Sequence, residues 1–508
     1  MVDGAPVVLG IDAGTTAVKA TVLTGEGEEI ATARTDIGVR RPGRDRAEQD
    51  PRDVWAAVAR TVREAVARAA PATVSAVGVT GQGDGAWLLD SGHAPVGPAL
   101  LWLDGRAARR VRDWQSDGRG ELLRRVTGAA PFSGALPVLL DELADTAPDL
   151  LVRARHHANC KDWIRLQLTG VLETDSSEAS RTYLDVATGR YSAELLAGLG
   201  HDRYADLLPP VVPAGAHRPL RPGPAGELGL RAGIPVVTGL VDTVAAGVGL
   251  GVLDPGQSYA IIGTTGFVGT VHPHAGHCRS GVGITVATGT GSTVVESLCP
   301  MSGSPNLDWV RSATGSAHLA WDEVSELVLS VAPGAEGVLY LPYGAEAGER
   351  APFVDGAATA SWLGVTTTTT PAQLMRAVYE GIALSMRECR ETLGGRASLR
   401  MCGGAASSDT VCRIVADVTG CRIERPRATE LGARGVAALA LTAVTGHDLA
   451  SATGALLGEL DVFEPEPAHR DLHDRQFATF VAVRDAVRPH WPALRTLRSG
   501  AATPHPTA

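Results

Sequence analysis

The chain has 508 residues, 44% of them hydrophobic, with 60 glycines and a formal net charge of −10. This length exceeds the size at which one hydrophobic core stops growing, so we expect about two domains of roughly 240 residues each. The negative charge argues against nucleic acid or an anionic membrane as the main partner. Seven widely spaced cysteines without a CxxC pair argue against a disulfide framework or a zinc ribbon. We expect a cytoplasmic protein with no signal peptide and no membrane span.

The first informative motif is GIDAGTT, at residues 10–16. A strand-like apolar run stops there at Gly and Thr, and a second run follows at 18–23, which predicts a β-hairpin. Such a turn can aim backbone N–H groups and a Thr hydroxyl at phosphate oxygens. Asp12 beside the turn would repel phosphate unless a cation lay between them, which indicates Mg²⁺. For a single motif of this kind, an ordinary tight turn is the alternative.

The next segments predict a helix followed by a strand. Residues 50–70 place valines on one helical face, with a proline suited to the first turn. A strand at 76–80 then leads into GQGDGAWLLD, at residues 81–90. In open α/β sheets ligands gather at the carboxyl ends of strands, so we expect polar residues of this segment near a ligand.

A third candidate is VTGLVD, at residues 237–242. It ends a strand-like run, and Asp242 opens a helix-like stretch of small residues, which makes its carboxylate the candidate catalytic base. The alternative is that Asp242 only caps a helix. A second turn, IIGTTGF at 261–267, repeats the first motif one domain later. In the HPHAGHC segment at 272–278, four possible metal ligands are too crowded for a tetrahedral site, so we expect a loop.

The C-terminal half predicts more helices. Thr370, Pro371 and Gln373 form the pattern of a capping box, so a helix should begin there and stop at the Gly pair 394–395. A strand at 398–401 precedes CGGAASSD, whose Gly-Gly turn could present helix N-terminal amides to a phosphate; a plain βα turn is the alternative. Residues 429–445 are Ala-rich and helix-like, with Gly432 and Gly435 breaking the pattern. Beyond about residue 491 we expect a tail.

These motifs together, with LLWLDGRA (100–107), KDWIRLQLTG (161–170), LPYGAEAGERAPFVD (341–355) and YEGIALSMRE (379–388), resemble the FGGY carbohydrate kinases over residues 7 to about 487. The resemblance implies an α/β fold of two actin-like (ribonuclease H-like) ATPase domains with a cleft between them. The expected division is 1–246, 247–487 and a tail at 488–508. The implied activity is ATP-dependent phosphorylation of a sugar or polyol hydroxyl.

The resemblance also implies roles for individual residues. Asp242 matches the general base, and Asp12 the residue that holds Mg²⁺ with ATP. The expected nucleotide-binding residues are Gly14, Thr15, Thr16, Lys19, Gly263, Thr264, Thr265, Gly403, Gly404 and Ala405. Cys402 and Ala406 stand where a third Gly and a basic residue are common in the family.

The substrate is the open question. Besides Asp242, the expected substrate-binding residues are Gln82, Asp84, Trp102, Asp104 and Arg106, although Asp104 and Arg106 could instead form a structural ion pair. Xylulose kinases carry Met-His where this chain has Gly83 and Asp84, and GQGDGAW is similar to erythritol kinases. We therefore favour an erythritol-like polyol or ketose of four or five carbons.

Two alternatives stay open, a pentulose kinase of the xylulose or ribulose type and a catalytically silent regulator that binds sugar or nucleotide. The retained Asp242 favours an enzyme, because a regulator needs no carboxylate there. The expected partner is a small sugar or polyol, with no nucleic acid and no membrane. A homodimer is compatible with the sequence, which does not fix the oligomeric state.

Overall fold

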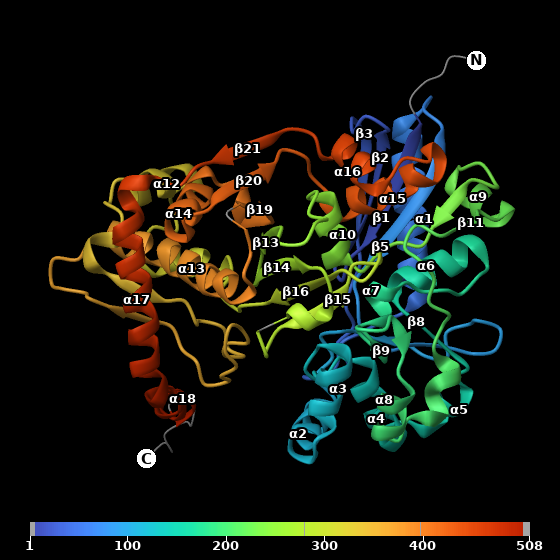
Figure 1. Cartoon of the computed structure of the whole chain (residues 1–508), viewed down its shortest axis with the longest axis horizontal. Coiled ribbons are helices and arrows are strands. Elements are labelled where there is room, and N and C mark those ends of the chain that lie inside the picture. The colour runs from blue at the N-terminus through green and yellow to red at the C-terminus, as the bar shows by residue number, and fades with distance from the viewer. Residues whose placement is uncertain (1–5, 279, 397, 501–508) are drawn as a thin grey trace, which may run out of the picture.

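Two α/β domains, each built on a mixed sheet, make up the computed structural model, which describes residues 6–278, 280–396 and 398–500 (Figure 1). The first sheet has the order β11-β12-β5-β1-β2-β3. Its strands are β11 (His217–Pro219), β12 (Pro235–Val237), β5 (Val74–Gly81), β1 (Val7–Ala13), β2 (Ala17–Thr24) and β3 (Glu29–Asp36).

The second sheet has the order β15-β16-β14-β13-β19-β20-β21. Its strands are β15 (Ile284–Ala287), β16 (Val294–Leu298), β14 (Gly266–His272), β13 (Ser258–Ile262), β19 (Ser398–Cys402), β20 (Arg422–Pro426) and β21 (Leu460–Phe463).

The two sheets share one topology. In β3-β2-β1-β5-β12 and in β16-β14-β13-β19-β20, the first two pairings are antiparallel and the last two are parallel. Both predicted hairpins form, as β1–β2 and β13–β14. The repeated order confirms the predicted pair of similar α/β halves, each with a Gly-Thr turn at the tip of its central hairpin.

The helices predicted from capping signals form at the expected places. Helix α1 (Pro51–Ala69) begins at Asp50, whose side chain accepts from the Arg52 N–H. Helix α13 (Pro371–Leu393) begins at Thr370 with the predicted capping box and ends at Gly394, which is in the left-handed conformation. A side-chain cap at one end and glycine at the other satisfy backbone groups that a helix terminus leaves free.

Helix α15 (Leu431–Thr445) confirms the helix expected at 429–445, and Gly432 and Gly435 lie inside it. A Cβ at Gly435 would lie 2.0 Å from the Ala245 carbonyl oxygen in α10 (Asp242–Gly249). These glycines therefore permit close packing inside a helix. Helix α15 also packs on β1 and β5, so a segment from the C-terminal half of the chain covers the first sheet beside α16 (Leu449–Leu457). The division at residue 246 stays a prediction.

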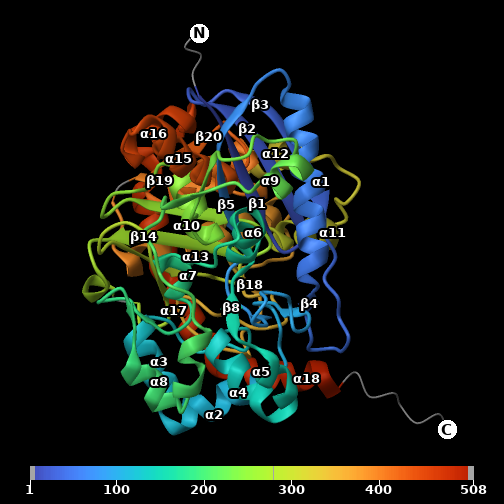
Figure 2. The ribbon, with the colours of Figure 1, turned by 90° about the vertical axis from the view of Figure 1, so that its right-hand side faces the viewer.

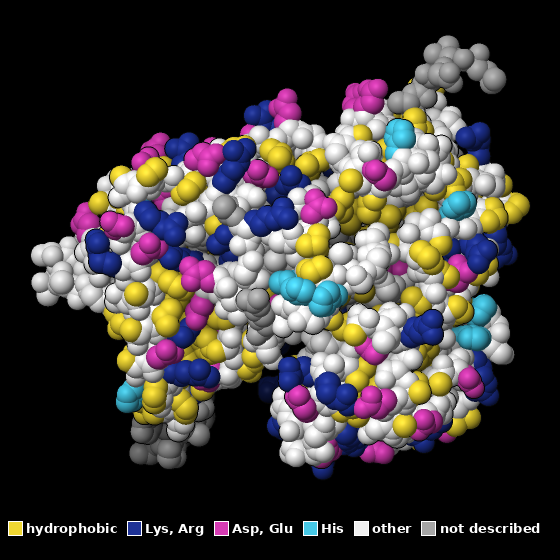
Figure 3. Space-filling view, in the orientation of Figure 1, with side chains coloured by type: hydrophobic (Ala, Val, Ile, Leu, Met, Phe, Trp, Pro, Cys, Tyr) yellow, Lys and Arg dark blue, Asp and Glu magenta, His cyan; other side chains and the backbone are white. Residues whose placement is uncertain are grey.

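The remaining helices surround the two sheets (Figure 2). A helical lobe lies below the first sheet in Figures 1 and 2, and the surface is notched between it and the second domain in Figure 3. The lobe contains α2 (Ala108–Asp117), α3 (Arg119–Thr127), α4 (Leu136–Thr146), α5 (Pro148–Arg153) and α8 (Ala193–Leu199). Others in the first domain are α6 (Cys160–Thr169), α7 (Ser176–Ala179) and α9 (Pro222–Leu228). The second domain has α11 (Pro305–Ala313), α12 (Trp321–Leu329), α14 (Asp409–Thr419), α17 (Arg470–Val487) and α18 (Trp491–Gly500).

Four two-stranded elements complete the fold: β4 (Glu48–Gln49) with β7 (Ala99–Leu100), β6 (Trp87–Leu89) with β8 (His156–Ala158), β9 (Leu184–Asp185) with β10 (Arg190–Tyr191), and β17 (Leu339–Leu341) with β18 (Ser361–Leu363).

The segment expected as a tail from residue 488 is helical up to residue 500, and Trp491 is fully buried against Phe353 and Tyr343. Composition suggested a tail, but one buried indole anchors the segment; residues 501–508 lie outside the described part. All seven cysteines are free. No helix within the described ranges is long and apolar enough to cross a membrane.

Candidate active site

Three carboxylates converge beside the first sheet. Asp12 lies near the end of β1, Asp84 follows β5, and Asp242 is the first residue of α10. Burial, together with the charges of Asp12 and Asp84, raises the pKa of Asp242 to about 7, although the Thr243 N–H and Arg181 act to lower it. Burial also raises the pKa of Asp12 to about 6. A group of buried carboxylates with raised pKa values is typical of a functional site.

The start of α10 is held firmly. The Val241 N–H donates to Ser177 Oγ at 2.9 Å, and Thr80 Oγ1 donates to the Leu240 carbonyl at 2.6 Å. A Cβ at Gly83 would lie 2.5 Å from Val241 Cγ2. Gly83 therefore leaves room for the turn that presents Asp242. The close contact between Gly83 and Val241 fixes Asp84 and Asp242 relative to each other.

Asp84 forms an ion pair that no local sequence pattern indicates. Its φ of 62° is left-handed, and its carboxylate accepts from Arg181 Nε and Nη2 at 3.1–3.2 Å. The Arg181 guanidinium also lies over the Phe132 ring, 5.5 Å from its centroid. Its Nη1 is buried and has no hydrogen-bond partner among the described residues. This arrangement places a free donor beside a carboxylate, a combination suited to binding hydroxyl groups.

The first Gly-Thr turn belongs to a closed ring of hydrogen bonds. Thr15 Oγ1 donates to Gln82 Oε1 at 3.0 Å, Gln82 Nε2 donates to Gln49 Oε1 at 2.8 Å, and Gln49 Nε2 donates to the Thr15 carbonyl at 2.8 Å. Trp102 Nε1 donates to Thr15 Oγ1 at 3.0 Å, and its side chain is 43% exposed. The ring fixes the backbone of the turn and leaves the indole face accessible to a ligand.

Asp104 and Arg106 form a structural ion pair, as the alternative to substrate binding predicts. Asp104 is fully buried and accepts from the Ala47 N–H at 2.8 Å and from Arg106 Nε at 2.8 Å. Arg106 also donates to Glu48 Oε1 at 2.5 Å. These bonds tie the loop that carries Trp102 to β4. Direct contact of either residue with a substrate stays a prediction.

The second turn is more open than the first. Thr264 and Thr265 are exposed, and neither hydroxyl has a hydrogen-bond partner in the described part of the chain. Gly403 follows β19 with a φ of 99°, and a Cβ there would lie 2.6 Å from the Ile262 carbonyl oxygen. A Cβ at Gly404 would have nothing within 4 Å. The backbone of this segment, which continues through Ala405, is therefore bare beside the turn, as close approach of a phosphate or ribose requires.

Lys19 is engaged within the protein. It pairs with Asp12 across the β1–β2 register and forms an ion pair with Glu430 at 2.8 Å. Glu430 precedes α15, and a Cβ at Gly432 in that helix would lie 2.7 Å from Asp12 Oδ2. Helix α15 thus closes one side of the Asp12 region. A direct contact of Lys19 with the nucleotide, like those of Gly14 and Thr16, stays a prediction.

Both domains of the chain match models of known protein families. Residues 7–249 match the N-terminal domain of the FGGY family of carbohydrate kinases, and residues 258–444 match its C-terminal domain. Erythritol kinase from Brucella abortus is 30% identical over 96% of this chain and 98% of its own length. The chain belongs to the FGGY family of carbohydrate kinases. It is therefore an ATP-dependent carbohydrate kinase.

Other FGGY kinases agree with this assignment. L-xylulose/3-keto-L-gulonate kinase from Escherichia coli is 30% identical over 93% of this chain and 95% of its own length. Gluconate kinase from Lactobacillus acidophilus superimposes with a TM-score of 0.90 at 22% identity, over 96% of this chain and 99% of that structure. At that identity the structural match confirms the two-domain FGGY fold, and it leaves the substrate of this kinase open.

Proposed function

We propose that this kinase phosphorylates a small acyclic polyol of four or five carbons, with a tetritol such as erythritol favoured. The observation that carries the proposal is the Asp84–Arg181 pair beside Asp242. A carboxylate accepts hydrogen bonds from neighbouring hydroxyls, and the buried Arg181 Nη1 can donate one. The similarity to the erythritol kinase of Brucella abortus supports this choice.

In this proposal Asp242 is the general base. Its carboxylate takes the proton of the attacking hydroxyl as the hydroxyl oxygen bonds to the γ-phosphorus of ATP. The bond from that phosphorus to the β–γ bridging oxygen breaks, and ADP leaves with the electron pair. Most catalysis of phosphoryl transfer comes from alignment and charge stabilisation. Asp84 and Arg181 would align the hydroxyls, and the exposed Trp102 ring would cover the carbon face of the substrate.

The residues beside the first turn fit a divalent cation. Asp12 offers a carboxylate whose pKa is raised by burial and by Glu430, so added positive charge would stabilise its ionised form. We propose that Asp12 holds the Mg²⁺ that accompanies ATP. Mg²⁺ bound with the nucleotide neutralises charge on the phosphates. We expect those phosphates to be positioned by backbone N–H groups of Thr15 and Thr16 and by the N–H groups and free hydroxyls of the second turn.

The competing proposal is a pentulose kinase, which the similarity to xylulose and L-xylulose kinases supports. A ketose differs from a polyol by one carbonyl, which cannot donate a hydrogen bond. Asp84 accepts only, so it favours a substrate that presents hydroxyls at every carbon. This difference makes the two candidates separable by kinetics.

The deciding experiment is an ADP-release assay with Mg·ATP and a panel of erythritol, threitol, the pentitols, xylulose, ribulose and glycerol. We expect the highest kcat/KM with one tetritol. The Asp84→Asn variant should have a much lower kcat/KM for that tetritol and a nearly unchanged KM for ATP. A ketopentose with a higher kcat/KM would overturn the polyol proposal and favour the pentulose alternative. Turnover with none of the panel would exclude these compounds as substrates and overturn the polyol proposal.

A further inference from the structure

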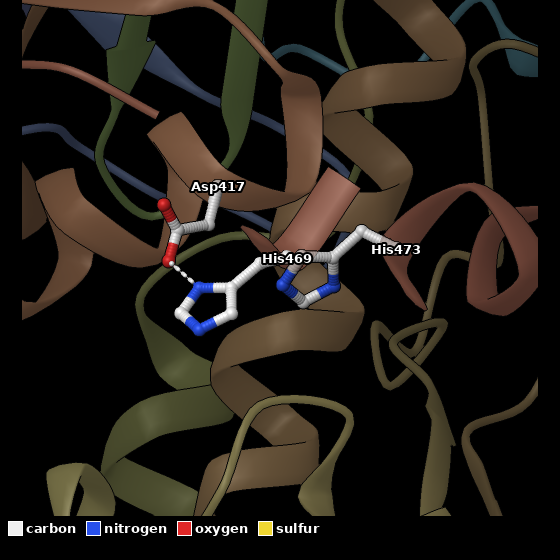
Figure 4. A group of neighbouring side chains, drawn as sticks. All are labelled: Asp417, His469 and His473. Carbon is white, nitrogen blue, oxygen red and sulfur yellow. Dashed lines mark hydrogen bonds and ion pairs between the residues drawn. The ribbon is translucent and has the colours of Figure 1, made fainter. Parts of the chain in front are cut away.

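A cluster of metal-ligating side chains lies in the second domain, apart from the carboxylates of the active site. It consists of Asp417 on α14, His469 just before α17, and His473 in the first turn of α17 (Figure 4). One carboxylate oxygen and one ring nitrogen of each histidine all lie within 4.8 Å of one another. The HPHAGHC segment, by contrast, forms no such group among the described residues.

The spacing of the two histidines suits a shared ion. Residues four apart on a helix lie on one face, and two histidines at this spacing are a recurrent zinc-binding arrangement. Two ligands bound to one tetrahedral Zn²⁺ at 2.0–2.1 Å lie about 3.4 Å apart. His469 Nδ1 and Asp417 Oδ2 already lie 3.0 Å apart. Small side-chain rotations would therefore be enough to bring the three ligands to one ion.

The second observation concerns His473, which is completely buried. Its Nδ1 lies 2.8 Å from Gln476 Oε1, while Gln476 Nε2 donates to Glu380 Oε2 at 2.6 Å. Glu380 also accepts from Arg376 Nε at 2.7 Å. Because this carboxylate can only accept, the amide orientation of Gln476 is fixed, and His473 Nδ1 must be the donor.

In a neutral imidazole whose Nδ1 is the donor, His473 Nε2 carries the lone pair. This nitrogen is buried and has no hydrogen-bond partner among the described residues. A buried acceptor without a donor is uncommon and destabilises the folded state. A metal-binding histidine has this arrangement, with one nitrogen donating to an oxygen of the protein and the other facing the ion. Figure 4 shows the His473 ring beside the His469–Asp417 pair.

We propose that Asp417, His469 and His473 bind a transition-metal ion of the Zn²⁺ class, with water completing the coordination. Two imidazoles and a carboxylate suit Zn²⁺ better than Mg²⁺, which prefers oxygen ligands. His469 is partly exposed, which gives the ion access. The neighbouring Arg470 is paired with Asp474, which offsets its positive charge. The ion would join α17 to α14, the helix that begins just after the Gly403–Ala405 segment.

The test uses the full-length kinase without an affinity tag, stripped with EDTA and then dialysed into Mg²⁺ buffer. Titration with Zn²⁺ should saturate at one ion per chain and raise the melting temperature, because an ion that binds only the folded state stabilises it. Co²⁺ should give a visible absorption band. His469→Ala, which changes a partly exposed side chain, should abolish all three signals and leave basal turnover with Mg·ATP close to that of the unmodified enzyme.

Two further variants separate this site from its rivals. Gln476→Leu removes the acceptor of His473 Nδ1–H and should weaken Zn²⁺ binding about 10-fold or more, although all three ligands remain. A variant with His274→Ala and His277→Ala removes two of the three histidines of the HPHAGHC segment and should bind Zn²⁺ unchanged. Absence of saturable binding, or binding that survives His469→Ala and is lost in the His274/His277 variant, would overturn the proposal.

Discussion

The two domains of this FGGY kinase share a strand order but place different chemistry at equivalent positions. After β5 in the first domain come Gln82 and Asp84, and after β19 in the second come Gly403 and Gly404. Beside the first Gly-Thr turn lies Asp12, whereas Ile261 holds the matching position beside the second. The first domain therefore concentrates carboxylates, and the second offers bare backbone. One architecture can thus serve two ligands, a polyhydroxylated one and a phosphorylated one.

The two Gly-Thr turns also differ in rigidity. In the first turn the Thr15 hydroxyl is already bonded to Gln82 and Trp102. In the second turn the Thr264 hydroxyl has no such partner in the described part of the chain. A pre-bonded hydroxyl organises the protein, while a free one is available to a ligand. Mutations of matched residues in the two domains should therefore affect different measurements.

The largest effect should follow from Asp242→Asn. The amide cannot accept the hydroxyl proton, so we expect kcat to fall about a thousandfold, in the range typical for loss of a general base. Binding of Mg·ATP, measured by calorimetry, should be retained. Asp254→Asn, an exposed aspartate after α10, is the control and should keep near-normal turnover. Near-normal turnover of Asp242→Asn would contradict the assignment of the base.

The adjacent glycines of the second domain provide the next test. Gly403→Ala forces a side chain onto a φ of 99° and against Ile262, so we expect unfolding free energy to drop by more than about 2 kcal/mol in a denaturant titration. Gly404→Ala meets no protein atom within 4 Å. It should fold normally and raise the KM for ATP with little change in the KM for the polyol. Equal ATP affinity in Gly404→Ala and the unmodified enzyme would show that this backbone does not approach the nucleotide.

The two turns can be compared through Thr15→Val and Thr264→Val. Loss of the Thr15 hydroxyl leaves the buried Gln82 Oε1 without its donor, which should cost about 1–3 kcal/mol of stability. Loss of the exposed Thr264 hydroxyl should leave the melting temperature unchanged and reduce kcat/KM for ATP. If both variants lose the same stability, the proposed difference in rigidity between the turns is wrong.

Local sequence signals predicted much of this fold. The Gly-Thr hairpins, the capping box at Thr370 and the start of α10 at Asp242 each depend on neighbouring residues, and all form as expected. The packing role of Gly432 and Gly435 could not be predicted in the same way, because it depends on Asp12 and on Ala245, which lie in distant segments.

Arg181 and Gln49 could not be predicted for the same reason, because their partners lie far away in the sequence. Arg181 lies 97 positions from Asp84, and Gln49 lies 33 positions from Gln82. Neither pairing leaves a pattern in one sequence, because the contacts arise only when β5, α7 and the β4 loop meet. The choice between a structural and a substrate-binding role for Asp104 needed the fold as well. The structure supplies the ion pair with Arg106, which spacing alone left open.

The smallest expected effect is on the pH dependence of turnover. It tests the carboxylates of the first domain, which have no counterpart beside the second turn. With a pKa raised to about 7, Asp242 is protonated below that pH and cannot act as a base. We therefore expect kcat/KM for the polyol to fall up to tenfold per unit as the pH drops below about 7. Asp84→Asn removes one of the charges that raise this pKa, so the fall should begin at lower pH, shifted by less than about one unit. The control is Asp254→Asn, which should leave the profile in place. A fall that begins at the same pH in Asp84→Asn would mean that Asp84 does not act on Asp242 through its charge, and the two carboxylates would then serve the substrate independently.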